Sequence, residues 1–73
     1  LVIPRKEITQ LGQMTDEDER LVGHLMKVAG QVAKEQGFDD FRLVVNNGAG
    51  AGQTVFHLHL HVIGGRGLHW PPG

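Results

Sequence analysis

Residues Thr54-Val55-Phe56-His57-Leu58-His59-Leu60-His61-Val62-Ile63 alternate between apolar and histidine side chains. Side chains of a β-strand point in turn to the two faces of a sheet, so this stretch predicts a strand with one apolar face and one histidine face. We expect the apolar face to enter the core and the histidine face to carry chemistry. The apolar set is Phe56, Leu58, Leu60 and Val62, and the histidine set is His57, His59 and His61.

The histidine face has three possible interpretations. A polar strand face that only meets water is disfavoured, because histidine is a poor general choice for that role. A zinc or copper site is conceivable for imidazoles two residues apart, but no carboxylate or thiolate follows the triplet to complete it. The favoured interpretation is nucleotidyl or phosphoryl transfer, in which a neutral imidazole attacks phosphorus and forms a covalent intermediate. A protonated neighbouring imidazole would then stabilise the phosphate oxygens or protonate the leaving group.

The glycine-rich segment Asn46–Gln53 precedes this strand and follows a second β-rich run, Phe41–Val45. Two such runs separated by a loop of this length predict an antiparallel hairpin. Glycines allow backbone N–H groups to approach phosphate oxygens, and Asn46, Gln53 and Thr54 add side-chain donors. No acidic residue lies between Phe41 and Gly73, so this segment would not repel an anion.

A long helix is predicted from Asp16 to Gln36. Thr15 is a suitable N-cap, the acidic residues that follow it suit the positive end of the helix dipole, and Gly37 predicts the C-terminal stop. One apolar stripe is formed by Leu21, Leu25, Val28 and Val32. Gly23 and Gly30 lie on one side of this helix, where either packing on the protein's own sheet or a helix pair across a dimer would explain them.

Length and composition limit the possible functions. The 73 residues predict a single domain, and seven basic against eight acidic residues give a formal charge of −1, without the basic excess typical of proteins that bind nucleic acid. No apolar run is long enough to span a membrane, and the chain has no cysteine. We therefore expect a soluble cytoplasmic protein with no nucleic-acid or membrane partner.

The first residues, Leu1-Val2-Ile3-Pro4, resemble the end of a buried strand. We expect residues 1–73 to be one domain that is truncated at its N-terminus and that lacks earlier strands and a helix. A chain of this size has marginal independent stability, so these residues alone are expected to be weakly stable or inactive.

The stretch from Gly52 to Arg66 resembles the signature of the histidine triad (HIT) superfamily, His-x-His-x-His followed by apolar residues. The Gly64-Gly65-Arg66 sequence and the ending His69-Trp70-Pro71-Pro72-Gly73 are similar to the HINT branch, the histidine triad nucleotide-binding proteins. This resemblance implies an α+β fold, in which one long helix packs on an antiparallel sheet, and a hydrolase of purine nucleoside phosphoramidates that needs no metal or other cofactor.

The resemblance also implies a role for individual residues. His59 would attack the α-phosphorus of an AMP-like substrate, His57 would orient His59, and His61 would contact the phosphate and assist proton transfer. Trp70 would reach the active site of a second subunit, which implies a homodimer. Contacts to the phosphate and ribose are implied for Asn46, Gly52, Gln53, Thr54 and Val55, together with His59, His61 and Trp70.

Two functions remain open from the sequence, an enzyme that hydrolyses P–N bonds and a nucleotide-binding scaffold with incidental catalysis; the triad favours the enzyme. Among the other polar residues, His24 is expected on the surface or at an interface. Arg5 and Lys6 are expected in solvent. Arg66 is equally suited to attracting nucleotide charge and to anchoring the C-terminal loop.

Overall fold

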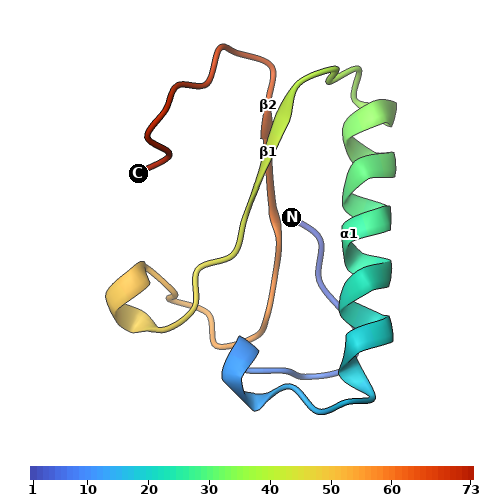
Figure 1. Cartoon of the computed structure of the whole chain (residues 1–73), viewed down its shortest axis with the longest axis vertical. Helices are drawn as coiled ribbons and strands as arrows, with labels where there is room; N and C mark the ends of the chain where they lie inside the picture. Colours follow the sequence, from blue (N-terminus) through green and yellow to red (C-terminus); the bar gives the residue numbers. More distant parts are fainter.

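A β-hairpin and one long helix form the framework of the molecule (Figure 1). The computed structural model describes all residues from 1 to 73. Strands β1 (Phe41–Val44) and β2 (His61–Gly64) pair antiparallel, in a register that runs from Phe41 opposite Gly64 to Val44 opposite His61. The predicted hairpin is therefore confirmed, and the helix α1 (Asp18–Glu35) packs beside it as the α+β architecture requires.

The predicted strand Thr54–Ile63 is wrong in its extent, because the regular ladder begins only at His61. Before that residue, the chain lies beside the N-terminal segment, where Val2 and Leu60 exchange two backbone hydrogen bonds of 2.8 Å. Pro4 follows at the next paired position of that segment, and proline has no N–H to donate to a ladder. The Leu58 N–H bonds to the carbonyl of Ile8 instead, and the chain bends at residues 55–57, so this part of the chain does not form a regular strand.

The C-terminal end of α1 follows its sequence signal closely. Gly37 adopts a left-handed conformation with φ 78°, its N–H bonds to Lys34 O at 3.0 Å, and the Phe38 N–H bonds to Ala33 O at 2.9 Å. This pair of bonds is a Schellman motif, which satisfies carbonyls that the helix leaves unpaired. The predicted stop at Gly37 is confirmed.

The N-terminal end of α1 differs from the prediction. The helix begins at Asp18, and Thr15 does not cap it with its side chain. The Asp18 carboxylate accepts from the Thr15 N–H at 2.9 Å and from its hydroxyl at 3.2 Å, which is half of a capping box. Lys6 Nζ lies 2.6 Å from the other Asp18 oxygen, so Lys6 is an ion-pair partner as well as a solvent-facing residue. The hydrogen bond from Lys6 holds the pKa of the Asp18 carboxyl below its usual value and raises the pKa of the Lys6 ammonium.

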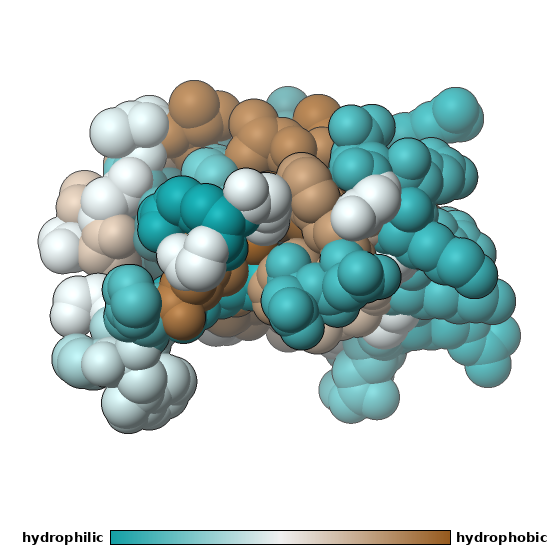
Figure 2. Space-filling model, turned by 90° about the horizontal axis from the view of Figure 1, so that it is seen from above, coloured by the Kyte–Doolittle hydropathy of each residue, from teal (hydrophilic) through white to brown (hydrophobic).

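The hydrophobic core lies between α1, the N-terminal segment and the segment that leads into β2. Its buried members are Val2, Ile8, Leu25, Ala29, Leu58 and Leu60. The predicted apolar stripe of α1 packs against this core. The most buried positions of the helix are Ala29 and Ala33, because their small side chains let the helix approach the core closely. Phe56 was expected in the core, but 54% of its surface is exposed. Viewed from above, the apolar residues form a band beside the hydrophilic outer side of the helix (Figure 2).

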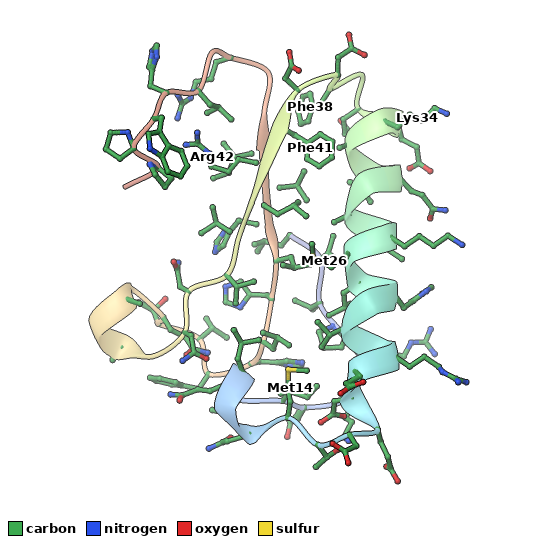
Figure 3. The ribbon with its side chains drawn as sticks, in the orientation of Figure 1. Met14, Met26, Lys34, Phe38, Phe41 and Arg42 are labelled. Atoms are coloured by element: carbon green, nitrogen blue, oxygen red, sulfur yellow. The ribbon has the colours of Figure 1, made fainter.

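Two glycine positions show how the helix and hairpin meet. An added Cβ at Gly64 would lie 2.5 Å from the ring of Phe38, so only glycine leaves room for this aromatic side chain. Phe38 and Phe41 lie together where α1 leads into β1 (Figure 3). At Gly23 and Gly30, in contrast, an added Cβ would meet nothing within 4 Å. The explanation that these helix glycines pack closely on the protein's own sheet is therefore wrong. No helix of the molecule is both long and apolar enough to cross a membrane.

Candidate active site

The three histidines alternate with buried leucines, as the sequence pattern predicted. Leu58 and Leu60 are buried, with 3% and 4% of their surfaces exposed, whereas His57, His59 and His61 are each half-buried. The core thus fixes the backbone, and the imidazoles remain within reach of a ligand.

His59 is held by the backbone of its own segment. Its Nδ1 lies 2.7 Å from the carbonyl oxygen of His57. A carbonyl can only accept a hydrogen bond, so this contact requires the proton to be on Nδ1. In the neutral ring, Nε2 then carries the lone pair and is the atom available for attack on an electrophile.

The neighbouring histidines give this ring a defined environment. His57 Nε2 lies 3.1 Å from the carbonyl of Pro4, so it donates to that oxygen and anchors the backbone that supports His59. The rings of His59 and His61 meet edge to face, with centroids 4.9 Å apart. The histidines do not converge in the geometry of a metal site, because no group of three or more potential ligand side chains is placed to hold an ion.

The glycine-rich loop is a compact turn closed by its own backbone. Residues Ala49–Ala51 form a 3₁₀ turn, and Gly48 and Gly52 flank it with φ of 91°, which glycine adopts without strain. The N–H groups of Ala51, Gly52 and Gln53 all bond to carbonyls within this turn at 3.0–3.1 Å. The loop therefore already uses several of the N–H groups that the sequence offered to a phosphate, including that of Gly52.

Gln53 has the most constrained side chain of the loop. Only 4% of its surface is exposed, its Oε1 accepts from Gly48 N–H at 2.7 Å, and its Nε2 donates to Thr9 O at 2.8 Å and to Val55 O at 3.3 Å. Both amide hydrogens are thus in use inside the protein. A direct side-chain contact from Gln53 to phosphate would require these bonds to break.

Thr54 and Val55 carry the unused donors at this end of the loop. Neither residue's N–H has a hydrogen-bond partner within the chain, and both residues are exposed together with the Thr54 hydroxyl. The Asn46 side chain lies close to Gly52, because an added Cβ there would be 3.9 Å from Asn46 Nδ2. Of the predicted phosphate contacts, these two N–H groups, the hydroxyl and Asn46 remain free to bind.

Comparison with known proteins identifies the family to which this loop and these histidines belong. The family model for the HIT domain matches residues 1–68, nearly the whole chain. The chain belongs to the HIT family. Within this family it is 58% identical to a HIT-like protein of Synechocystis, which it matches over its full length while covering 65% of that relative. The chain thus spans about two thirds of the length of the relatives that it matches.

Solved HIT structures share this fold. A HIT family hydrolase from Legionella pneumophila superposes with a TM-score of 0.90 at 40% identity, over 97% of this chain and 65% of the other. A histidine triad protein from Clostridium difficile gives a TM-score of 0.84 at 38% identity, over 92% and 60% of the two chains. The predicted HIT-like α+β fold is therefore confirmed.

The C-terminal residues of this HIT chain lie on the side of the hairpin that faces away from α1 (Figure 1). Arg42 donates to the carbonyl of His69 at 2.8 Å and holds the tail near β1. Trp70 exposes 84% of its surface. Arg66 bonds only to the carbonyl of Gly67, at 3.1 Å, which fits an anchor of the loop. His24 is exposed on α1, as predicted.

Proposed function

We propose that the protein is a cytoplasmic hydrolase of purine nucleoside phosphoramidates, of the HINT type. The observation that carries this proposal is the hydrogen bond from His59 Nδ1 to the carbonyl of His57, because it leaves the Nε2 lone pair for attack on phosphorus. HIT family membership and the hydrolase from Legionella pneumophila support hydrolysis as the reaction class.

The reaction proceeds in two displacements. His59 Nε2 forms a bond to the α-phosphorus while the P–N bond of the substrate breaks, and the leaving nitrogen takes a proton and departs as an amine. Water then attacks the nucleotidyl-histidine, so that the monophosphate leaves and the imidazole is restored. His61, whose ring contacts that of His59, is suited to touch the phosphate and to carry the proton.

The phosphate site in this proposal lies where the loop meets the histidine segment. The N–H groups of Thr54 and Val55 have no partner within the chain, and the Thr54 hydroxyl and the Asn46 amide add donors. An anion that accepts several such bonds is held without a metal ion.

We propose that a second copy of this chain completes the site in a homodimer. Trp70 exposes 84% of its surface, which fits a residue that acts across a subunit interface. The open space beside Gly23 and Gly30 allows another backbone to approach α1 closely.

The test is single-turnover mass spectrometry with adenosine 5′-phosphoramidate. We expect a covalent nucleotidyl adduct and released AMP from the full-length protein, neither of which forms with His59→Ala. His24→Ala is the matched control, since His24 is an exposed histidine on the helix and the adduct should persist. A chelator should leave turnover unchanged. Absence of both adduct and turnover in the unsubstituted full-length protein would refute the proposal.

A further inference from the structure

Gln53 is the polar side chain that the loop buries most deeply, and the mechanism above does not use it. We propose that Gln53 is a positioning residue that fixes the phosphate loop relative to the histidine segment. This inference rests on the proposed function, since it concerns how the same site is held in place.

The Gln53 amide joins three separate stretches of backbone. Its oxygen holds the start of the loop at Gly48, and its nitrogen holds Thr9 in the N-terminal segment and Val55 on the way to the histidines. All three bonds come from one planar group with little freedom to move, because the side chain is 4% exposed. A displacement at any of the three stretches is therefore resisted by the other two.

The position of these bonds explains why they matter for binding. The segment from Gln53 to Leu60 has no strand ladder, so backbone pairing alone does not fix it. The bond to the Val55 carbonyl orients the peptide group that follows Val55, immediately after the two unpaired N–H groups of Thr54 and Val55. Without this bond, those donors lose their fixed relation to His59.

A second tether supports the same connection from outside the loop. Asn47 Oδ1 accepts from the Leu11 N–H at 2.7 Å, two residues beyond the Thr9 carbonyl that Gln53 binds. The loop is thus attached to residues 9–11 at two points, of which the Gln53 bond is the buried one. The buried bond is expected to matter more, because water cannot replace it.

The test compares Gln53→Met with a purely structural control. Methionine has a similar length but cannot make any of the three bonds, so we expect kcat/KM for adenosine 5′-phosphoramidate to fall about tenfold to a hundredfold, mainly through a higher KM. Asp18→Asn removes another buried polar link, between Lys6, Thr15 and α1. It should lower the melting temperature without changing KM. Activities are compared per folded molecule, below the melting transition of each variant.

The outcomes separate the two proposals. Unchanged kcat and KM in Gln53→Met, or equal losses in Gln53→Met and Asp18→Asn, would overturn the positioning role while leaving the hydrolase intact. Gln53→Glu keeps the acceptor for Gly48 but loses the donors to Thr9 and Val55, so we expect KM to remain high in that variant as well. A KM restored to normal would contradict the role of the donor bonds. Lack of turnover in the unsubstituted full-length protein would instead refute the proposed function and this inference with it.

Discussion

The two ends of the hairpin are held together by different means. At the end where Phe41 faces Gly64, four residue pairs form a regular antiparallel ladder, and Phe38 covers Gly64. At the end that carries the histidines, the backbone makes only isolated contacts with the N-terminal segment, and side chains supply the remaining bonds.

Under the proposed function, this difference places the chemistry at the end with the least backbone pairing. A strand in a full ladder uses its N–H and C=O groups on its neighbours. Before His61, the carbonyl of His57 is free to orient His59, and the N–H groups of Thr54 and Val55 are free for a ligand. Weak pairing is thus a condition for the site, and the polar side chains of Gln53 and His57 stabilise it in place of a ladder.

The largest effect is expected when the anchor of the histidine end is removed. His57→Phe keeps an aromatic ring but leaves the Pro4 carbonyl without its donor, which costs about 1–3 kcal/mol for a buried acceptor. Because the His57 carbonyl also orients His59, we expect steady-state kcat to fall by about tenfold to a hundredfold. His24→Phe makes the same substitution at an exposed position and should retain wild-type kcat. Full activity in His57→Phe would show that this bond does not support the site.

The ladder end is tested by filling the space under Phe38. In Gly64→Ala the new methyl group would lie 2.5 Å from the ring, so Phe38 must shift, at a cost of about 1–3 kcal/mol in the free energy of unfolding. Urea denaturation measures the loss, and kcat per folded molecule should stay unchanged. Gly67→Ala, where a Cβ would meet nothing within 4 Å, is the control. A loss of kcat in Gly64→Ala would mean that the two ends are coupled.

A smaller effect is expected at the link between the N-terminal segment and α1. The pKa of Asp18 is lowered in the folded protein, chiefly by the hydrogen bond from Lys6. The ionised carboxylate therefore stabilises the folded state more than the protonated form does. The carboxylate therefore contributes stability above its unfolded pKa, and this contribution disappears as the pH falls through the lowered folded value. Asp18→Asn should be less stable than wild type at pH 7, with the difference shrinking in acid. Asp16→Asn, at an exposed position, is the control, and a difference independent of pH would contradict the linkage.

Local signals in the sequence predicted much of this architecture. The hairpin, the stop at Gly37 and the single histidine face all depend on neighbouring residues, so they could be recognised before folding. The start of β2 could not, because it depends on where β1 ends and on Pro4, which lies more than fifty residues away in sequence. Phe56 was misplaced for the same reason, since alternation predicts a face only where a partner covers it.

The site was predictable as a set of residue types but not as a set of free and occupied donors. Gln53 had the chemistry of a phosphate ligand, yet its bonds to Thr9 and Gly48 form only after the chain folds. Thr54 and Val55 could be named as candidate contacts, but their unpaired N–H groups are visible only once the bonds inside the loop are known. Tertiary hydrogen bonding therefore decides which of the candidate donors remain available.

The smallest effect on stability is expected in α1, which lies beside the hairpin. Alanine is favoured over glycine inside a helix by about 1 kcal/mol, and a Cβ at Gly23 or Gly30 meets nothing within 4 Å. Gly23→Ala/Gly30→Ala should therefore stabilise the dissociated chain against urea by about 1 kcal/mol per site. In the proposed dimer the same methyl groups would occupy space needed by the partner, so sedimentation should show weaker association. Gln31→Ala, at an exposed helix position, should leave association unchanged. Stabilisation of the double variant without any change in association would show that these glycines do not lie in a dimer interface. The proposed ligand site would not be affected by that result.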